Sequence, residues 1–504
     1  MSLNDLVVAI QGVLADKILI VVLVGAGLWF TFNLGFIQVR GFGEGWKRTF
    51  GGLFKKSDKA GKEGMSSFQA LATAIAAQVG TGNLAGAATA IAMGGPGAIF
   101  WMWVSAFLGM ATIYAEALMA QKYKQVGDDG TVTGGPVYYI RAAFTGKFGK
   151  ILAATFAVLI IFALGFMGNA VQSNSIGDAF GTAFGINPWI IGVIIAAISL
   201  FVFVGGISRI ASLTEKIVPI MAAFYIVGAL IVIICNGNMI PKAFHDIFVG
   251  AFNPQAIGGG VLGWTVSRAL ARGVGRGLFS NEAGMGSTPH AHAVAKVDHP
   301  VEQGFVAMMG VFIDTFVVLT LTALVILTSG MVGQTDPLTG AAFTGTALTQ
   351  AGFASVFGKF GEVFIAICMF FFAFSTIIGW YFFGEANIKY LFGSKAVKVY
   401  AILVAVCIVA GSAVKVDLIW NMADCFNSAM VIPNIIGLFA LSKVVKEVHK
   451  DYFNNFKPKQ MKKNKYWKRR WEDISCESVS ETGNRRRCKP GNGQLTGETF
   501  RQKE

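Results

Sequence analysis

The chain has 504 residues, of which 54% are hydrophobic and only 14% charged, and its mean hydropathy is +0.59. Soluble domains carry about 25% charged residues, so this composition excludes an ordinary soluble globular protein, and it equally excludes disorder over most of the chain. The 62 Gly and 43 Phe are typical of membrane helices that pack through small residues and show aromatic rings to lipid. The composition predicts an all-α polytopic membrane protein.

The net charge of +14 is concentrated in the C-terminal tail, 443–504, and in short loops. In a membrane protein this pattern marks the cytoplasmic side, where Lys and Arg meet anionic lipid headgroups. We therefore expect membrane lipids, and not nucleic acid, as partners of the basic residues. The chain contains no GxxxxGK[ST] motif, so ATP-driven pumping is unsupported and we expect no cofactor.

About eleven apolar segments are long enough to cross the hydrocarbon core, which requires about 20 residues. Their boundaries are predicted at 18–38, 66–93, 98–120, 151–171, 186–206, 217–235, 256–285, 304–329, 360–384, 398–413 and 418–441. Loops rich in Lys and Arg alternate with loops nearly free of them, provided that the seventh segment also spans. This alternation predicts a multi-pass protein of the cell membrane with its N-terminus outside and its C-terminus in the cytoplasm.

Two of these segments are interrupted in the same way. The second contains Gln78-Val79-Gly80-Thr81-Gly82-Asn83, and the seventh contains a glycine-rich stretch from Gly273 to Gly284. Glycine lowers helix stability by about 1 kcal/mol relative to alanine, so both stretches favour unwinding. Taken singly, each could be a packing or kink site. An unwound backbone inside a membrane is tolerated only where protein or a water-filled cavity satisfies its polar groups.

The positions of the interruptions carry more information than their composition. Segments two to six and seven to eleven form two sets of five, each beginning with an interrupted helix, and an odd number inverts the second set. Paired interruptions of this kind indicate the binding site of a secondary transporter. The predicted domains are a peripheral helix with a basic loop (1–65), a first repeat (66–236), a second repeat (237–442) and a largely disordered tail (443–504).

Unwound helices inside a membrane expose N–H groups, which suit a carboxylate, and carbonyl groups, which suit an ammonium group or Na⁺. The side chains of Thr81 and Asn83 add a hydroxyl and an amide, while Ser280 and Asn281 are expected to cap the helix that restarts after the second break. The first break contains no carboxylate, so neutral oxygens would have to bind the cation.

Three motifs carry a family resemblance: AQVGTGNLAGAATAIAMGGPGAIFWMW (77–103), GGPVYYI (134–140) and RGLFSNEAGMGS (276–287). Over about 10–445 the chain resembles the alanine or glycine:cation symporter family, whereas the tail after about 455 does not. The resemblance implies the five-plus-five inverted-repeat fold of the LeuT type, preceded by one extra helix. It also implies a transporter and not an enzyme.

The resemblance further implies the site residues. In FAFSTIIGWYFFGE (372–385) a Thr and a Trp four residues apart would line the pocket, which bulky aromatic side chains keep small enough for alanine or glycine. The implied substrate-binding residues are Gln78, Gly80, Thr81, Gly82, Gln172, Phe279, Thr376 and Trp380. The implied cation-binding residues are Ala76, Val79, Asn83, Ser375 and Thr376.

Some of these residues have simpler interpretations. Trp380 could face lipid or belong to the core, and Gln172 could lie at the membrane interface. Ser375 and Thr376 could bond to carbonyl groups one turn earlier.

Ionisable residues inside membrane segments are functional candidates. We expect Glu116, near the basic cytoplasmic end of the third segment, to form a salt bridge. Glu282 is expected to cap the restarting helix or to pair with Arg276. Asp314 has no obvious partner in the sequence, so either a proton site or a structural ion pair would explain it.

Two groups of residues invite other interpretations. Arg268, Arg272 and Arg276 repeat every four residues and are expected to line a wet vestibule or to bind lipid headgroups. The stretch HAHAVAKVDHP contains His290, His292 and His299 but no Cys, so we expect a cytoplasmic loop and no metal besides transported Na⁺.

The two breaks predict a secondary transporter, and the family resemblance implies Na⁺-coupled symport of a small neutral amino acid, alanine or glycine, into the cell by alternating access. Glutamine or serine as substrate, and H⁺ as the coupling ion, stay open as alternatives. A channel is disfavoured because the pseudo-symmetry lies inside one chain. An intramembrane enzyme would need a nucleophile and a base close together, and the sequence suggests no such pair.

Overall fold

A computed structural model describes residues 3–51, 64–126, 132–253, 265–336, 340–413 and 416–460. These residues are almost entirely helical, because long apolar runs favour helices that satisfy their own backbone groups. The strands in the described residues are β1 (Gln125–Val126) and β2 (Val132–Thr133), which pair antiparallel. The prediction of an all-α protein is confirmed.

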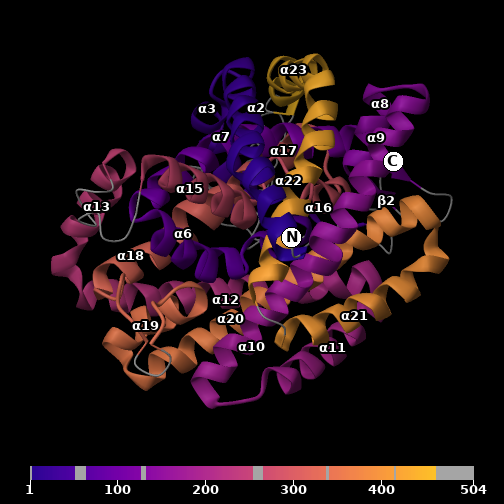
Figure 1. Ribbon diagram of the computed structural model, residues 1–504. Helices are drawn as coiled ribbons and strands as arrows, with labels where there is room; N and C mark the ends of the chain where they lie inside the picture. Colours follow the sequence, from indigo (N-terminus) through magenta and orange to yellow (C-terminus); the bar gives the residue numbers. More distant parts are fainter. Residues whose placement is uncertain are drawn as a thin grey trace, which may run out of the picture. The chain divides into compact units, whose positions relative to one another are not determined.

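The chain divides into two units, Met1–Lys446 and Glu447–Glu504. The helices of the first half (Figure 1) are α1 (Leu3–Val13), η1 (Leu14–Leu19), α2 (Ile20–Asn33), α3 (Ile37–Arg40), α4 (Phe42–Phe50), α5 (Ser67–Gln78), η2 (Gly82–Gly86), α6 (Ala87–Gly94), α7 (Gly97–Lys122), α8 (Pro136–Ala143), α9 (Gly146–Ile160), η3 (Ile161–Gly168), α10 (Asn169–Phe184), α11 (Pro188–Val204) and α12 (Gly206–Cys235).

The second half continues with further helices. They are η4 (Gly237–Met239), α13 (Ile240–Phe252), α15 (Val266–Asn281), α16 (Pro289–Ala293), α17 (Pro300–Val311), η5 (Phe312–Leu319), α18 (Thr320–Ser329), α19 (Gly345–Phe357), α20 (Lys359–Phe392), η6 (Ser394–Ala396), α21 (Val397–Ala413), α22 (Val416–Ala440), α23 (Ser442–Asp451) and η7 (Tyr452–Phe456). Residues 442–460, the start of the predicted tail, are helical. The remainder of the tail, 461–504, lies outside the described residues.

Eight helices among the described residues are long and apolar enough to span a membrane. They are Leu6–Asn33, Gly97–Lys122, Gly146–Phe184, Gly206–Cys235, Pro300–Ser329, Lys359–Phe392, Ser394–Ala413 and Ile419–Ala440. The predicted fifth segment forms the shorter apolar helix α11, and the second and seventh are broken. The count of eleven is therefore not confirmed by this criterion.

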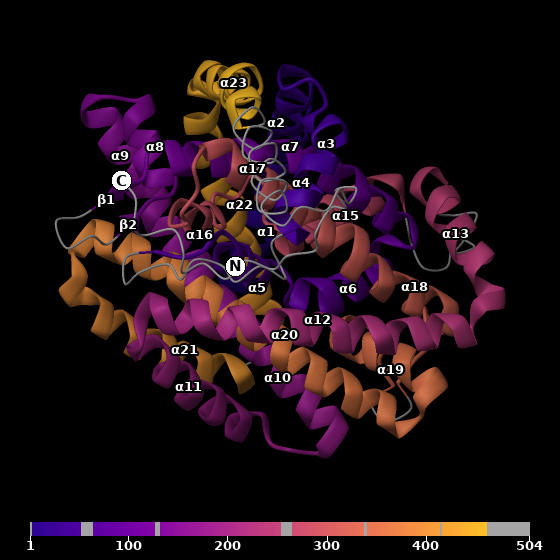
Figure 2. The ribbon, with the colours of Figure 1, turned by 180° about the vertical axis from the view of Figure 1, so that it is seen from behind.

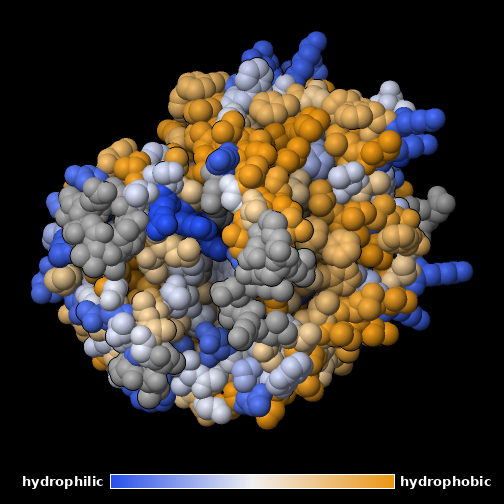
Figure 3. Space-filling view, in the orientation of Figure 1, coloured by the Kyte–Doolittle hydropathy of each residue, from blue (hydrophilic) through white to orange (hydrophobic). Residues whose placement is uncertain are grey.

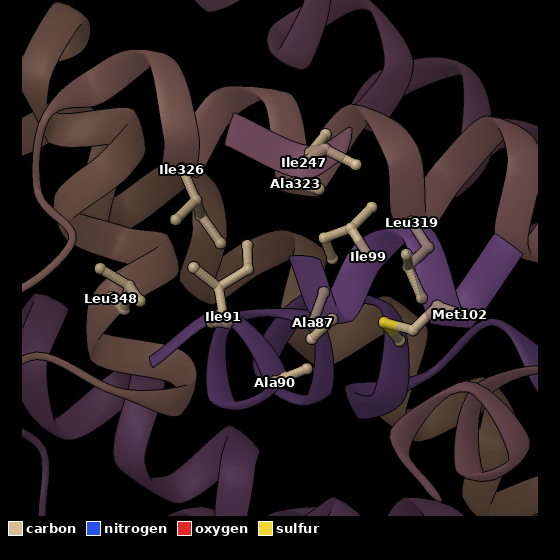
Figure 4. Packing of buried hydrophobic residues seen from close by; sticks show 12 residues of the cluster. Ala87, Ala90, Ile91, Ile99, Met102, Ile247, Leu319, Ala323, Ile326 and Leu348 are labelled. Atoms are coloured by element: carbon tan, nitrogen blue, oxygen red, sulfur yellow. The ribbon is translucent and has the colours of Figure 1, made fainter. Parts of the chain in front are cut away.

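Helix α7 packs against both α15 and α17, and α10 packs against α20 and α21. In the reverse view of Figure 2, α12 runs alongside α20, a neighbour that it also contacts. An apolar cluster joins α6, α7, α13, α18 and α19 through small and branched side chains (Figure 4). A Cβ on Gly97 would lie 2.1 Å from the backbone carbon of Gly250, so only glycine lets α7 approach α13 this closely.

Large apolar side chains remain exposed on several long helices. Val21, Val204 and Ile234 are each more than 70% exposed. Hydrophobic residues cover much of the surface in Figure 3, on the side where Figure 1 draws α9, α11 and α21. An apolar exterior of this extent fits a protein whose solvent is lipid.

Candidate functional site

The first break lies where the sequence predicts it. Helix α5 ends at Gln78, Val79 and Gly80 are unwound, and the chain is helical again from Thr81, which leads into η2. The amide oxygen of Asn83 accepts a hydrogen bond from the Gly80 N–H at 3.0 Å, and that of Gln172 accepts one from the Thr81 N–H at 3.2 Å. Side chains therefore take over the backbone donors that the missing helical turn leaves free.

The glycines of this break permit close approach. A Cβ on Gly80 would lie 2.3 Å from Oγ1 of Thr376 in α20, and one on Gly82 would lie 2.9 Å from Cα of Ser280 in α15. The absence of a side chain at both positions lets these helices meet the unwound backbone.

The hydroxyl groups of α20 reach the end of α5. Oγ1 of Thr376 donates toward the carbonyl oxygens of Ala76 at 2.9 Å and Phe372 at 3.0 Å. Ser375 makes the same pair of contacts at 3.3 and 2.9 Å. The contacts with Phe372 are the bonds to the previous turn that the simpler interpretation expects. The contacts with Ala76 bring together three of the predicted cation-binding residues, and Val79 lies three residues farther along, fully buried.

The second break lies later than predicted. Helix α15 continues through Gly273 to Asn281, and the unwound stretch covers 282–288. Gly273 serves packing, because a Cβ there would lie 2.5 Å from a backbone oxygen of α7. The helix ends at Glu282, a non-glycine residue in the left-handed region at φ 57°. Ser280 and Asn281 thus end α15 and do not cap the next helix, so that prediction was wrong.

Two carboxylates hold the second break in place. The carboxylate of Glu282 accepts hydrogen bonds from the indole N–H of Trp380 and, at 2.5 Å, from the hydroxyl of Ser287. That of Glu116 accepts from the Gly284 N–H at 3.0 Å and from the Asn434 amide at 2.5 Å. Both carboxylates are fully buried.

These contacts overturn two expectations. Among the described residues neither Glu116 nor Glu282 forms an ion pair with a basic side chain, so the predicted salt bridge of Glu116 and pairing of Glu282 with Arg276 were wrong. The physical reason is depth: both carboxylates are surrounded by neutral N–H and O–H donors of the break and its neighbours.

A third carboxylate connects the two breaks. Asp314, in η5, accepts hydrogen bonds from the Asn83 amide at 2.7 Å, from the Ser280 hydroxyl at 2.9 Å and from the Thr315 hydroxyl at 2.8 Å. Asn83 follows the first break and Ser280 precedes the second. The structure therefore supplies the partners of Asp314 that the sequence does not reveal.

Beside the second break lies an ion pair that the sequence did not predict. Arg276 binds both carboxylate oxygens of Asp424 at 3.2 and 3.0 Å, and Gln11 in α1 donates to the same carboxylate at 2.8 Å. The guanidinium also lies 4.7 Å from the ring of Trp420. Asp424 is the single carboxylate in the last predicted segment, and that placement was the available signal.

A cavity of about 650 Å³ opens next to these residues. Both Arg272 and Arg276 line it, which confirms the expected vestibule for these two residues; Figure 3 shows hydrophilic residues beside a hollow near α15. Its wall comes from α1, η2, α6, α10, α15, the start of α19 and α22. The lining residues are Val8, Gln11, Ala85, Thr89, Met93, Asn174, Ser175, Asp178, Arg272, Arg276, Thr344, Gly345, Thr346, Trp420 and Asn421.

Aromatic rings lead from this cavity toward the second break. The ring of Trp420 in the cavity wall lies 5.1 Å from that of Phe279, which lies 5.7 Å from that of Trp380. Trp380 is 1% exposed and does not face lipid. Gln172 is equally buried and contacts the first break, so its interfacial interpretation was wrong.

Gln78 links the two breaks from the other direction, because its amide donates to the carbonyl oxygen of Asn281 at 2.7 Å. Its Oε1 and the Thr81 hydroxyl are buried polar atoms with no hydrogen-bond partner among the described residues. Each such atom costs about 1–3 kcal/mol when left unsatisfied. Buried polar atoms of this kind indicate a place for a ligand or water.

The three histidines of the histidine-rich stretch are buried, whereas Lys296 and Asp298 between them are exposed. His290 and His292 belong to α16, where Ser287, Asn387 and Gln303 are their hydrogen-bond partners. In the described part of the chain, no three His, Cys, Asp or Glu side chains gather closely enough to hold a metal ion.

Comparison with known proteins assigns the family. The family model for the sodium:alanine symporter family matches residues 1–466. The chain belongs to the sodium:alanine symporter family. The match extends beyond the region, about 10–445, over which the sequence motifs suggest the resemblance. Members of this family are secondary transporters and not enzymes, as expected.

Relatives across the family differ in their named substrates. The sodium/alanine symporter AgcS of Methanococcus maripaludis is 43% identical over 449 residues, which cover 88% of this chain and 96% of AgcS. The probable sodium/glutamine symporter GlnT of Bacillus subtilis is 43% identical over 451 residues, 89% of this chain and 91% of GlnT. The amino-acid carrier protein AlsT of Bacillus subtilis is 42% identical over 438 residues, 86% of this chain and 89% of AlsT.

A solved structure shares the fold. MhsT, solved in complex with L-phenylalanine, superposes with a TM-score of 0.51 at 12% identity, over 77% of this chain and 99% of that chain. This likeness supports the LeuT-type fold that the motifs imply.

Proposed function

We propose that this protein couples the entry of a small neutral amino acid, alanine or glycine, to the downhill movement of Na⁺. The observation that carries the proposal is the meeting of two broken helices, held by α20 and η5, in a chain of the sodium:alanine symporter family. Na⁺ is a transported substrate in this proposal, and no resident cofactor takes part.

The first break suits the amino-acid carboxylate. The N–H groups of 80–82 lie where α5 has ended, and one of them is held by the Gln172 amide, which can exchange that bond for one to substrate. The unpartnered Oγ1 of Thr81 and Oε1 of Gln78 supply further contacts. Phe279 and Trp380 would limit the space for the side chain, which favours alanine or glycine.

The cation would bind next to this position. The carbonyl groups of Ala76 and Val79 and the hydroxyls of Ser375 and Thr376 are neutral oxygens of the kind that hard cations accept. Asn83 supports the site indirectly, since its amide holds Gly80 and Asp314. Thr376 would then contact both substrate and cation.

Alternating access requires a cavity that is open to one side of the membrane and a barrier toward the other side. The cavity is also lined by Val8 and Gln11 of α1, so with the proposed N-terminus outside it would open to the exterior. Toward the cytoplasm, Gln121 donates to the carbonyl oxygen of Ala295 at 2.9 Å, and Gln69 donates to Glu215 at 2.9 Å. The two repeats would rotate relative to each other around the breaks, so that the open side closes and the closed side opens. The basic tail would meet the anionic cytoplasmic leaflet of the cell membrane.

Glutamine is the second candidate substrate. GlnT and AgcS are equally similar to this chain in identity, so overall similarity does not choose between glutamine and alanine. The ring of Phe279 against Trp380 favours the smaller substrate. Serine and H⁺ coupling stay open as further alternatives, and a channel is disfavoured because the pseudo-symmetry lies inside one chain.

The test is uptake of labelled L-alanine into proteoliposomes under an inward Na⁺ gradient, with equal K⁺ and an inward pH gradient as controls. We expect saturable accumulation above equilibrium with Na⁺ alone. Accumulation of glutamine instead of alanine would replace the substrate, and uptake driven by pH alone would replace the ion. Loss of uptake in Thr376→Ala and Trp380→Ala, with normal membrane insertion, would support the site, whereas full activity in both would refute it.

A further inference from the structure

Helix α4 packs against the protein along one side. Gly41, which precedes the helix, Gly45 and Thr49 recur every four residues and are buried. A Cβ on Gly41 would lie 2.6 Å from the ring of Phe305, and one on Gly45 would lie 3.0 Å from Cγ of Met309. The two glycines therefore let α4 lie directly on α17, its neighbour in Figure 2.

A second side of α4 carries a row of three aromatic rings. Phe42, Trp46 and Phe50, here called the aromatic row, also recur every four residues, so they share one side of the helix. The rings of Trp46 and Phe50 lie 4.5 Å apart, and Trp46 is 50% exposed. The ring of Phe42 lies 4.9 Å from that of Phe312 in the span Pro300–Ser329. The aromatic row is thus continuous with a helix that is long and apolar enough to span the membrane.

The third side of α4 is positively charged. Lys47 is exposed, and no carboxylate of the described residues pairs with it. It follows Trp46 by about 100° around the helix, so its ammonium group and the indole face adjacent directions. The surrounding loop 39–65, predicted to be cytoplasmic, contains seven basic and three acidic residues. Anionic headgroups of the cytoplasmic leaflet attract basic segments of this kind.

An ion pair connects α4 to the helices around the first break. The guanidinium of Arg48 lies 2.9 Å from the carboxylate of Glu44 and 2.7 Å from that of Glu302, in the first turn of α17. Helix α17 also contacts α5, which ends at the first break. A ligand that holds α4 in place therefore acts on a direct neighbour of a broken helix.

We propose that the aromatic row and Lys47 bind phospholipid of the cytoplasmic leaflet, with a preference for an anionic headgroup. Helices that lie in a membrane interface carry aromatic and apolar residues on one side and Lys or Arg on another, as α4 does. The rings occupy the boundary between headgroups and acyl chains, while the ammonium group of Lys47 contacts the charged headgroup. This lipid site goes beyond the proposed function and does not depend on which amino acid or ion is transported.

Thermal unfolding of the full chain in detergent tests the site, with phosphatidylglycerol as the anionic lipid and phosphatidylcholine as the lipid without net charge. A ligand of the folded state raises the melting temperature as its concentration rises. We expect phosphatidylglycerol to stabilise the wild type at the lower concentration. In Lys47→Gln the half-stabilising concentration of phosphatidylglycerol should rise about fivefold, and that of phosphatidylcholine should not change. In Trp46→Ser both concentrations should rise about tenfold, because apolar contact is lost.

Lys216→Gln is the matched control. Lys216 is also an exposed lysine, in the loop 207–216 that is predicted on the same side of the membrane, and residues 206–223 contain no aromatic residue. Its replacement should leave both lipid concentrations unchanged. The basic tail is the same in all of these proteins, so any lipid that it binds contributes equally to each measurement.

The depth of Trp46 gives an independent measurement. The part of the fluorescence that Trp46→Phe removes should be quenched more by phosphatidylcholine with bromine atoms close to the headgroup than by lipid with bromine atoms at the chain ends.

Three results would overturn the lipid site. One is the same affinity for phosphatidylglycerol in Lys47→Gln and the wild type, and another is a Trp46 signal that brominated lipid does not quench. The third is loss of an oligomer in Trp46→Ser without a change in lipid affinity, because a second copy of the chain would then cover the aromatic row. Uptake of alanine tests the proposed function separately, so the two proposals can fail independently.

Discussion

The two breaks stabilise their unwound backbone with different kinds of side chain. In the first, neutral amides of Asn83 and Gln172 satisfy the exposed N–H groups. In the second, buried carboxylates of Glu116 and Glu282 bind the Gly284 N–H and the side chains around it. A neutral lining leaves the first break free to exchange its partners for a charged substrate. A carboxylate lining fixes the second break, since charge-assisted hydrogen bonds are about twice as strong as neutral ones.

The largest effect is expected from filling the first break. Gly80→Ala places a Cβ 2.3 Å from Thr376 Oγ1, so α20 and the unwound backbone must separate. We expect alanine uptake to fall below detection, and overpacking to lower the free energy of unfolding by about 1–3 kcal/mol. Uptake assays and thermal unfolding measure both. Gly25→Ala, where a Cβ meets nothing within 4 Å, is the control and should remain active.

At the second break, we expect removal of the Glu282 carboxylate to lower the free energy of unfolding more than it weakens substrate binding. Glu282→Ala leaves the Trp380 N–H and the Ser287 hydroxyl without their acceptor, which we expect to lower the free energy of unfolding by about 2–4 kcal/mol. Glu282→Gln keeps one acceptor and should lose about half as much. Thermal unfolding in detergent compares them, and equal losses would show that the acceptor does not matter.

A double-mutant cycle isolates the link from the second break to the pocket wall. Trp380→Phe keeps an aromatic side chain, but it replaces the indole with a smaller phenyl group and removes the N–H. The part of its effect that comes from the N–H should disappear when Glu282 is already replaced. We expect a coupling energy of about 1–2 kcal/mol in unfolding and a higher KM for alanine in Trp380→Phe. Additive effects would mean that the contact does not position the indole.

The first break should tolerate loss of a single neutral partner better. Gln172→Leu removes the acceptor of the Thr81 N–H and should lower stability by about 1 kcal/mol. Because that N–H is then unoccupied in the empty protein, we expect the substrate KM to change more than the maximal rate. Initial-rate kinetics measure the two separately, and a change confined to the maximal rate would contradict the role in binding.

The smallest predicted effect is the difference between the hydroxyl groups of Ser375 and Thr376. Thr376 lies 2.9 Å from the Ala76 carbonyl oxygen, whereas Ser375 lies 3.3 Å from it and bonds more closely to Phe372. Ser375→Ala should therefore raise half-saturating Na⁺ only about two- to threefold, and Thr376→Ala more. The dependence of thermal stability on Na⁺ in detergent tests this order, because Thr376→Ala is expected to lose uptake. The reverse order would contradict the stronger role of Thr376.

The sequence locates the first break almost to the residue, because Gly80 and Gly82 stand inside an otherwise apolar helix. The second break is misplaced because glycine has two uses in a membrane helix. Gly273 allows contact with α7, while the chain actually unwinds at Glu282, whose left-handed backbone no composition rule predicts. Separating the two uses requires knowledge of which helix lies opposite.

The partners of buried charges were the least predictable part. Glu116 lies near a basic loop in sequence, and that proximity suggests a salt bridge, but its partners come from Gly284 and Asn434, 168 and 318 residues away. The same holds for Asp314, whose contact with Asn83 spans 231 residues. The local sequence pattern identifies such residues as candidates, but only the folded arrangement of the helices shows which residues they bind.

The bond between Gln11 and Asp424 joins residues 413 positions apart, the first helix to the last predicted span. Ribosomes add about 5–20 residues per second, so the N-terminal helix is made roughly 20–80 s before its partner exists. During that interval its amide is a polar group in a nascent membrane protein without its final acceptor. The contact between α1 and α22 therefore forms late in biogenesis, although α1 is synthesised first.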